Sequence, residues 1–474
     1  MKRTKIVCTI GPASEKQKTL EAMMKAGMNV TRLNMSHGDY KWHARAVKTI
    51  RQAAKKTSEP VALLLDLQGP KVRIGELGIK NYELRNGESV VFTTGRADKK
   101  KIPIDYPRLH QEIKKGHRIL IADGVMECVV EAVKGQDIHA KVVAGGALVS
   151  HKGLNFPDTK ISLKALTAKD KKDLVFGVEQ GVDFIAFSFA RTAKDVMELR
   201  RLITQAEKSL GLRPLPFPKG ESSPPFSARG GSAFGGQKGG LRGISAPIQI
   251  IVKIEKQEAV KNFDEILKVV DGVMIARGDL ALETPFADVP IVQKEIIEKC
   301  RKAAKPVIVA TEMLASMEKN PRPTRAEISD VANAVIDHAD AVMLSAESAM
   351  GKYPVETVVT MAKIITETEA SRFDDVSLGK LAAVVGNIKA VKAILVSTLT
   401  GSEARAISQA RVEKPILAGS SSGRVVRQLN LSWGIYPIQV DNKKLLQIAK
   451  QKFNLKKGDQ VILVVGERID KKII

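Results

Sequence analysis

Eight short runs of β-branched and aliphatic residues recur along the chain, separated by longer stretches with helical character. Strands that alternate with helices in this way form a parallel sheet covered by helices. Eight is also the number of strands that closes a (β/α)8, or TIM, barrel. The runs lie at 5–10, 29–34, 61–67, 183–189, 248–254, 272–278, 306–312 and 341–347. We therefore predict an α/β fold built on such a barrel.

Polar residues end these runs, at the strand ends where barrels of this type carry their active sites. A charged group at the end of a buried strand costs free energy unless it is paired or binds a ligand. Structural ion pairs would explain one or two such residues more easily than the whole series. The series comprises Arg32, Asn34, Asp66, Ser188, Lys253, Glu255, Asp279, Thr311, Ser345 and Glu347. We expect these residues to gather in one active site.

Two neighbouring runs end with the densest charge, which suggests a metal-phosphate site. Glu255 and Asp279 offer the carboxylate oxygens that a hard cation such as Mg²⁺ prefers. Lys253 and Arg32 supply fixed positive charge, the kind that stabilises a transferring phosphoryl group. We expect Arg277 to shape its own turn rather than to touch phosphate.

The predicted barrel is interrupted twice. Residues 70–154 are rich in glycine and lysine with short alternating patches, which predicts a small β-barrel domain of antiparallel strands. It follows the third strand on the catalytic face, where an insertion can act as a lid. Residues 211–247 are rich in proline, glycine and serine and predict a disordered loop on the opposite face. That loop is either a neutral insertion or a docking site for a partner.

These patterns predict three domains, as expected for a chain of 474 residues. The barrel is expected at 1–69 and 155–369, and the lid at 70–154. Strands and helices alternate again at 370–474, which predicts a separate C-terminal α/β layer domain.

Composition excludes several classes of protein. No apolar run is long and uncharged enough to span a membrane, and the start of the chain does not resemble a signal peptide, so we expect a cytoplasmic protein. Three scattered cysteines argue against a disulfide scaffold or a zinc site. The net charge of +24 would suit nucleic acid, but aromatic residues make up only 4%, too few for a base-stacking surface. We therefore expect no specific nucleic-acid binding.

Seven segments together resemble the pyruvate kinase family. They are TKIVCTIGPAS at 4–14, NVTRLNMSHG at 29–38, KGLNFPDT at 152–159, VKIEKQEAVKNFDEIL at 252–267, DGVMIARGDLALE at 271–283, PVIVATEMLASM at 306–317 and PRPTRAEISDVANAV at 321–335. The resemblance covers essentially the whole chain outside 211–247. It implies a phosphotransferase that moves the phosphoryl group of phosphoenolpyruvate to ADP, giving pyruvate and ATP at the last step of glycolysis. It also implies a homotetramer.

The resemblance implies roles for individual residues around the phosphoryl group. Lys253 would stabilise that group during transfer, while Glu255 and Asp279 would bind Mg²⁺ or Mn²⁺. The residues that match contacts to phosphoenolpyruvate are Arg32, Lys253, Gly278, Asp279 and Thr311. Thr311 would lie near the point of enolate protonation, beside a polar relay of Ser345 and Glu347.

A second implied set contacts the nucleotide. Its members are Asn34, His37, Arg73, Lys152 and Asp123, the last on the lid. Without the resemblance, His37 is better explained as a hydrogen-bonded histidine at a helix start. Glu312 departs from the family pattern, because many relatives have glutamine after the threonine, and we assign no effect to it.

A further departure concerns the monovalent cation that many relatives require. The residues that match its usual ligands are Asn34, Ser36, Asp66 and Leu67, of which Leu67 offers only its backbone carbonyl. Lys71 stands where many relatives have glutamate, and Gln68 where they have lysine. This combination is similar to the potassium-independent members, in which an ammonium group replaces the charge of the ion. We expect turnover to require the divalent metal but not K⁺.

The last departure concerns regulation. The loop STLTGSEAR resembles one that binds an effector phosphate in some relatives, and its candidate contacts are Ser397, Thr398, Thr400, Gly401 and Ser402. Glu403 replaces a common hydroxyl residue, and the sequence ends at GERIDKKII without the family's final Gly-Thr-rich loop and strand. Activation by fructose-1,6-bisphosphate is therefore not expected. A sugar monophosphate, AMP, or a plain strand-to-helix turn without an effector all stay open.

Two other functions stay open on the sequence alone. One is a catalytically weak relative that acts as a binding or regulatory protein, with the 211–247 loop and the basic charge serving a partner. The retained set Arg32, Lys253, Glu255 and Asp279 argues against it. The other is a different Mg²⁺-dependent, enolate-forming barrel enzyme, such as an aldolase acting on pyruvate. The lid, the nucleotide-contact residues and the C-terminal layer argue against that.

Overall fold

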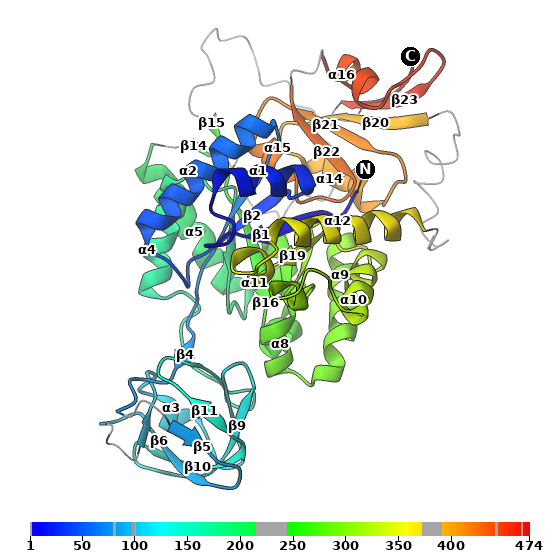
Figure 1. Cartoon of the computed structure of the whole chain (residues 1–474). Coiled ribbons are helices and arrows are strands. Elements are labelled where there is room, and N and C mark those ends of the chain that lie inside the picture. The colour runs from blue at the N-terminus through cyan, green and yellow to red at the C-terminus, as the bar shows by residue number, and fades with distance from the viewer. Residues whose placement is uncertain are drawn as a thin grey trace.

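The computed structural model describes residues 2–78, 82–96, 98, 101–211, 213–214, 244–245, 247–371, 391–440, 444–465 and 468–474. The loop predicted at 211–247 falls almost wholly outside these residues. Eight parallel strands close a barrel at the centre of the molecule, in the order β1-β19-β18-β17-β16-β13-β3-β2 (Figure 1). They are β1 (Lys5–Thr9), β2 (Val30–Asn34), β3 (Ala62–Asp66), β13 (Phe184–Phe187), β16 (Gln249–Ile254), β17 (Gly272–Ala276), β18 (Val307–Ala310) and β19 (Ala341–Leu344). Each of the eight predicted runs is one of these strands, so the predicted fold class is confirmed.

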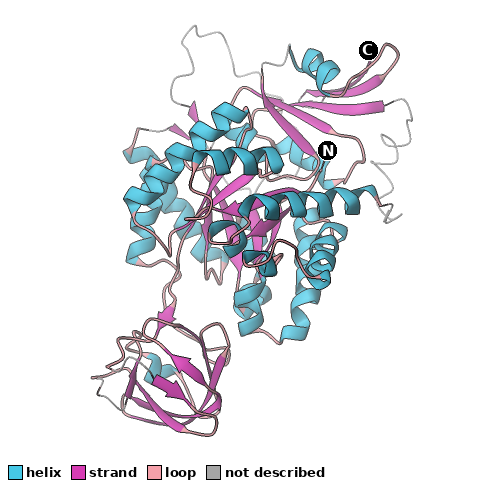
Figure 2. Cartoon of the chain, in the orientation of Figure 1, coloured by secondary structure: helices cyan, strands magenta, loops and turns pink. Residues whose placement is uncertain are grey.

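Helices surround the barrel on its outside (Figure 2). They are α1 (Gln17–Ala26), α2 (Tyr40–Thr57), α4 (Ala168–Glu179), α5 (Ala193–Ser209), α6 (Gln257–Lys261), α7 (Phe263–Val269), α8 (Arg277–Glu283), α9 (Val289–Lys302), α10 (Arg325–Ile336), α11 (Ala346–Ala349) and α12 (Pro354–Ala370). Capping boxes at Thr167, Thr192 and Thr324 begin α4, α5 and α10, because each threonine and the acid three residues later satisfy free backbone amides. No described helix combines the length and apolar character needed to cross a bilayer.

The barrel strands bury side chains on both faces, as parallel strands covered by helices must. One face packs against the helices, and the other fills the barrel with a small cluster that includes Val7, Leu64, Phe184 and Met274. Leu431 belongs to this inner cluster although it comes from the C-terminal domain, and it is fully buried. The C-terminal domain therefore contributes a side chain to the core of the barrel.

The insertion after β3 forms a separate β-barrel with its own hydrophobic core, at the lower end of the molecule in Figure 1. Its main sheet has the order β4-β12-β8-β9-β10-β6-β7, and a bridge between Ile74 and Ile104 joins the two edges. Its elements are β4 (Val72–Arg73), β5 (Tyr82–Leu84), β6 (Ser89–Thr93), β7 (Lys101–Pro103), α3 (Leu109–Glu112), β8 (Arg118–Ile121), β9 (Met126–Lys134), β10 (Asp137–Ala144), β11 (Gly146–Leu148) and β12 (Gly153–Asn155). One expectation was wrong in detail: the register of β6 and β7, with Val91 opposite Lys101 and Thr93 opposite Pro103, is parallel and not antiparallel.

The C-terminal domain has a five-stranded sheet in the order β22-β21-β20-β23-β24, at the end of the barrel away from the lid (Figure 1). Its elements are β20 (Val391–Ser397), α14 (Ser402–Gln409), β21 (Ile416–Ser420), α15 (Gly423–Leu429), β22 (Ile435–Gln439), α16 (Leu445–Lys452), β23 (Gln460–Val465) and β24 (Arg468–Ile473). β24 pairs antiparallel with β23, which corrects the expectation that this sheet lacks a final strand. The charges in RIDKK mask the strand in the sequence. A two-residue parallel pair, β14 (Arg213–Pro214) and β15 (Ile244–Ser245), borders the undescribed loop.

Candidate active site

The charged residues that end β2, β3 and β16 form one buried cluster. Arg32 donates to Asp66 Oδ2 from Nε at 2.7 Å and lies 2.6 Å from it through Nη2. Lys253 Nζ lies 3.4 Å from Asp66 Oδ2 and 2.7 Å from Glu255 Oε1, and it donates to Ser188 Oγ at 3.0 Å. The structure thus joins five of the ten strand-end residues that the sequence selected, namely Arg32, Asp66, Ser188, Lys253 and Glu255.

Neighbouring charges in this cluster keep Asp66 and Lys253 ionised. Burial alone would raise the pKa of Asp66, but the neighbouring charges of Lys253 and Arg32 lower it below its usual value. Burial alone would lower the pKa of Lys253, but Asp66 and Glu255 outweigh burial and raise it. Lys253 therefore carries its proton at any physiological pH and serves as a fixed positive charge, not as a proton donor.

Glu255 and Asp279 fit a divalent cation. Glu255 is 1% exposed; its Oε2 accepts from the amide of Phe189 at 2.8 Å, while its Oε1 has the ion pair with Lys253 but no aligned hydrogen bond. Burial raises the pKa of Glu255, and the negative charge of Asp279 raises it further. A cation between two such carboxylates would relieve both effects.

The number of protein ligands also matters for the choice of metal. Among the described residues no group of three or more His, Cys, Asp or Glu side chains is arranged to hold a metal ion. Mg²⁺ commonly uses only one or two carboxylates and completes its shell with water and substrate oxygens. The pair Glu255 and Asp279 therefore fits a Mg²⁺ site completed by water and substrate oxygens better than a metal site formed by protein ligands alone.

The loops after β17 and β18 are locked to each other. Thr311 has a φ of +72°, an unusual value for a β-branched residue, and its Oγ1 accepts from the amide of Gly278 at 2.8 Å. Arg277 donates to the Thr311 carbonyl at 2.8 Å and to both carboxylate oxygens of Asp330 at 2.6 Å. Arg277 therefore shapes this turn, as predicted. The sequence did not reveal Asp330 as its partner, although Asp330 lies within PRPTRAEISDVANAV.

Glu347 fixes the neighbouring loop after β19. It is 2% exposed, and its two carboxylate oxygens accept from the amides of Ser345 at 2.7 Å and Leu314 at 3.2 Å. Burial raises its pKa, although those amide hydrogen bonds oppose the rise. This geometry suits a residue that positions Ser345 and the Thr311 loop.

The residues predicted to contact nucleotide are divided between the barrel and the lid. On the barrel, Asn34 Oδ1 accepts from the amide of Ser36 at 3.1 Å, and His37 is exposed in the loop before α2. On the lid, Arg73 pairs with Gly153 across β4 and β12, which places it beside Lys152. The side chain of Asp123 is 72% exposed on a lid turn.

Lys71 bridges the lid and the barrel. Its Nζ lies 3.3 Å from Asp123 Oδ1 and 3.9 Å from Asp279 Oδ1. Its stem passes over Gly153, where a Cβ atom would lie only 2.5 Å from Lys71 Cε, so a larger residue there would require the end of the Lys71 side chain to shift. The ammonium group is thus beside the candidate metal ligand Asp279.

Most of the residues that match K⁺ ligands already have a hydrogen-bond or ion-pair partner within the protein. Asp66 pairs with Arg32 and Lys253, and the carbonyl of Leu67 accepts from Ser188 Oγ at 2.6 Å. Their oxygens are therefore less available to a monovalent cation than in an open site.

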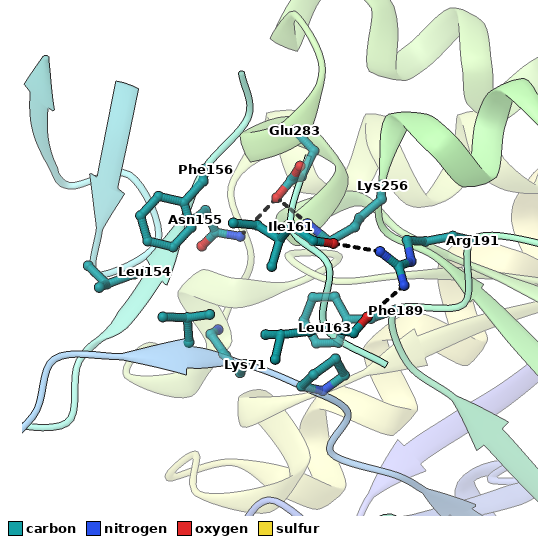
Figure 3. Close-up of a pocket in the computed structure, with 12 residues that line it drawn as sticks. Lys71, Leu154, Asn155, Phe156, Ile161, Leu163, Phe189, Arg191, Lys256 and Glu283 are labelled. Carbon is teal, nitrogen blue, oxygen red and sulfur yellow. Dashed lines mark hydrogen bonds and ion pairs between the residues drawn. The ribbon is translucent and has the colours of Figure 1, made fainter. Parts of the chain in front are cut away.

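A small pocket, partly open to solvent, lies at the hinge, between the lid linkers and the barrel (Figure 3). Figure 3 shows Arg191 reaching the carbonyls of Ile161 and Leu163, at 2.7 and 2.6 Å. It also shows Glu283 between Lys256, at 2.9 Å, and Asn155, at 3.4 Å. Sequence reasoning missed these hinge residues. The only signal was that Asn155, Lys256 and Glu283 lie inside the motifs that carried the resemblance.

The hydroxyl-rich loop after β20 is satisfied by its own carboxylate. Thr398 Oγ1 and Ser402 Oγ both donate to Glu403, the latter at 3.1 Å. The amide of Gly401 donates to Thr398 Oγ1 at 2.8 Å, and the hydroxyls of Thr400 and Ser402 are 2.7 Å apart. The carboxylate of Glu403 thus already accepts hydrogen bonds from two of the hydroxyls that were predicted to contact an effector phosphate.

A TIM barrel with a β-barrel domain inserted after its third strand, and with Lys253 between Asp66 and Glu255 at its strand ends, suits a barrel phosphotransferase. Comparison with known proteins gives the family. The chain matches the model for the pyruvate kinase barrel domain over residues 1–213 and 241–358, and the model for the pyruvate kinase alpha/beta domain over 379–472. The chain belongs to the pyruvate kinase family, whose members depend on a divalent metal and use phosphoenolpyruvate and ADP.

Individual relatives cover nearly the whole chain. Pyruvate kinase from Clostridium acetobutylicum is 38% identical over 98% of this chain and 96% of its own length. Pyruvate kinase from Geobacillus stearothermophilus is 40% identical over 98% of this chain and 78% of its own. The crystal structure of a pyruvate kinase from Cryptosporidium parvum superposes with a TM-score of 0.87 at 32% identity, covering 100% of this chain and 96% of that one.

Proposed function

We propose that this protein transfers the phosphoryl group of phosphoenolpyruvate to ADP with Mg²⁺ as its divalent metal and without a requirement for K⁺. The observation that carries the proposal is Lys253, held between Asp66 and Glu255 at the strand ends beneath the lid. Phosphoryl transfer needs fixed cations, a metal site and exclusion of water, and little covalent chemistry from the protein.

In this mechanism Lys253 and Arg32 stabilise the negative charge of the phosphoryl group. Both are already oriented by Asp66, so little reorganisation is needed when substrate binds. Glu255 and Asp279 would hold Mg²⁺, which when bound neutralises substrate oxygens. Gly278 offers its backbone to the substrate, and its amide is oriented by Thr311 Oγ1.

The protonation of the enolate belongs to the loops after β18 and β19. Thr311 is placed there by Arg277, which holds its carbonyl at 2.8 Å. Glu347 orients the amides of Ser345 and Leu314, and so fixes the polar relay rather than giving up a proton itself. Thr311 and Ser345 are the hydroxyl groups that remain to organise the proton donor.

The nucleotide is proposed to enter between barrel and lid and to contact Asn34, His37, Arg73, Lys152 and Asp123. Closure of the lid would bring the last three toward the barrel and exclude water. The hinge contacts of Arg191 and Glu283 support a lid that moves about a defined point.

Independence from K⁺ is supported by Lys71, whose ammonium group is fixed beside Asp279. We assay turnover in tetramethylammonium buffer free of Na⁺ and K⁺. Full activity without KCl is expected, whereas activity that appears only after KCl is added would contradict the proposal.

We also propose that the protein is a cytoplasmic homotetramer that fructose-1,6-bisphosphate does not activate. The hydrogen bonds from Thr398 and Ser402 to Glu403 support the absence of activation by the bisphosphate. Light scattering measures the mass in solution, and addition of the bisphosphate should leave the substrate dependence of the rate unchanged.

The activity itself is tested by coupling pyruvate formation to lactate dehydrogenase. Turnover that requires phosphoenolpyruvate, ADP and Mg²⁺ together is the expected result. A rate no higher than that of a buffer blank, from a folded protein, would favour the catalytically weak relative instead.

A further inference from the structure

The loop that joins β2 to α2 carries Asn34 and His37, two of the residues predicted to contact the nucleotide. His37 and Gly38 are exposed, and Gly38 has a φ of +75°. A loop that must be ordered when its ligand binds loses affinity, because the ordering costs entropy. Contacts that fix this loop from outside should therefore strengthen nucleotide binding.

Two side chains from neighbouring helices bind carbonyl groups of this loop. Lys169 Nζ, in the first turn of α4, donates to the carbonyl of Met35 at 2.6 Å. His43, on α2, lies with its Nε2 atom 2.8 Å from the carbonyl of His37. Because a carbonyl oxygen only accepts, Nε2 of His43 carries the proton. Burial lowers the pKa of His43, which keeps its ring neutral at pH 7.

Asp173, on α4, orients Lys169. Its side chain is fully buried, and its two oxygens accept from Lys169 Nζ at 2.6 Å and from the hydroxyl of Tyr40 at 2.7 Å. Tyr40 is the first residue of α2, and its ring stacks on that of Phe176 with 4.9 Å between the centroids. α4 thus holds both ends of the loop, through Lys169 at its start and Tyr40 at its end; α2 and α4 are neighbours in Figure 1.

The helix itself does not favour a lysine at position 169. The helix dipole opposes a cation in the first turn. A lysine four residues before an acid is also the less favourable order for such a pair. The side chain of Lys169 is 47% exposed, so it does not fill the core either. The hydrogen bond to the Met35 carbonyl is what this position provides.

The cations proposed to contact phosphoenolpyruvate are held by a different group. Arg32 lies 2.6 Å from Asp66, and Lys253 lies 3.4 Å from the same carboxylate. Loss of the Lys169 contact should therefore affect the nucleotide more than phosphoenolpyruvate.

We propose that Lys169 and Asp173 are positioning residues for the nucleotide. Lys169, oriented by Asp173, fixes the carbonyl of Met35. The loop then presents Asn34 and His37 to ADP in the conformation that binds it. The inference rests on the proposed function, because it takes ADP as the phosphoryl acceptor and this loop as part of the ADP site.

Steady-state kinetics of Lys169→Met tests the proposal, with the rate coupled to lactate dehydrogenase and each substrate varied in turn. The substitution removes the donor to the Met35 carbonyl, so KM for ADP should rise about tenfold. Both kcat and KM for phosphoenolpyruvate should stay within about twofold of the parent. Lys172→Met removes an exposed lysine from the same helix and should leave all three constants unchanged. Unfolding temperatures verify that the variants are folded.

Asp173→Asn separates positioning from direct contact. It leaves the charge of Lys169 in place but weakens the pair that orients it, so KM for ADP should rise severalfold. If Lys169 contacted the ADP phosphates directly, removing a nearby negative charge would leave KM for ADP unchanged or lower it. That result in folded Asp173→Asn would overturn the proposal. Should this buried substitution prevent folding, Lys169→Met decides alone.

Two results for Lys169→Met would also overturn the proposal. One is an unchanged KM for ADP, and the other is an equal loss for both substrates. Either result, obtained beside an active parent, leaves the proposed function intact. A folded parent without turnover would instead overturn the proposed function, and this inference with it.

Discussion

Both ends of the barrel carry buried charges, but only one end leaves them available. At the end opposite the lid, Asp183 is fully buried, pairs with Arg427 at 2.9 Å and accepts from the amide of Leu63 at 2.9 Å. Asp340 is satisfied in the same way by Arg411. At the lid end, Glu255 keeps an oxygen without an aligned hydrogen bond, and Asp279 remains partly exposed.

This difference separates structural charges from functional ones. A buried carboxylate whose oxygens are all satisfied by the protein holds two domains together and has no capacity left for a ligand. A cluster whose charges are paired, but in which some oxygens lack a hydrogen bond, keeps its side chains oriented. Those oxygens remain available to bind a ligand.

The largest effect is expected from Lys253→Met at the lid end. The substitution keeps the stem and removes the charge, so kcat of the folded variant should fall about 10³-fold or more. The coupled assay measures the loss. Lys363→Met, an exposed lysine on α12, is the matched control and should be unchanged. A Lys253→Met enzyme within tenfold of the parent would show that this lysine does not stabilise the reacting phosphate.

At the structural end, Asp183→Ala should act on stability and not on chemistry. It leaves Arg427 and the amide of Leu63 without their partner, which should cost about 3–5 kcal/mol of unfolding free energy. Urea unfolding measures this cost, and kcat of the folded variant should stay near that of the parent. A loss of activity with full stability would contradict the division between structural charges at this end of the barrel and functional charges at the lid end.

Lys71→Glu tests whether a charge of the protein replaces a bound ion at the lid end. Turnover without KCl should fall about tenfold or more and should recover when KCl is added, because the ammonium group beside Asp279 is gone. Lys141→Glu makes the same charge change at an exposed site on lid strand β10 and should need no KCl. If Lys71→Glu remains fully active without KCl, the ammonium group does not have this role.

The smallest effect is a pH dependence of stability from the structural end. Burial, assisted by repulsion from Lys2, lowers the pKa of Lys5 to about 7, against about 10.4 in an unfolded chain. Between those values the unfolded chain binds a proton that the folded chain has lost, so the free energy of unfolding should rise with pH. Lys2 and Lys305, whose pKa values are each lowered to about 8, act with the same sign.

Lys5→Met should reduce that slope without abolishing it. Urea unfolding at pH 7, 8 and 9 compares the variant with the parent, and Lys363→Met is again the matched control. A slope that is identical in all three proteins would assign the pH dependence to other groups.

Local sequence pattern was enough for the barrel and for much of the site. Each barrel strand is a short apolar run, and the chemistry-bearing residues follow those runs directly, so a (β/α)8 arrangement collects Arg32, Asp66 and Lys253 at one end. The final strand β24 was missed because RIDKK has little apolar alternation, and its pairing with β23 provides what its own pattern lacks.

The partners of these residues were not visible in the sequence. Arg277 meets Asp330, Glu283 meets Asn155 across the hinge, and Arg411 meets Asp340 across two domains. Each pair joins segments far apart in the chain, and no local periodicity reports such a contact.

The sequence by itself determined the barrel, the inserted β domain and the charged groups that gather at one end of the barrel, because strand pattern and residue chemistry are local properties. Only the tertiary structure decided which charges are satisfied and which stay available. That depends on how many donors and acceptors surround each group in space, because a buried polar group without a hydrogen-bond partner costs free energy.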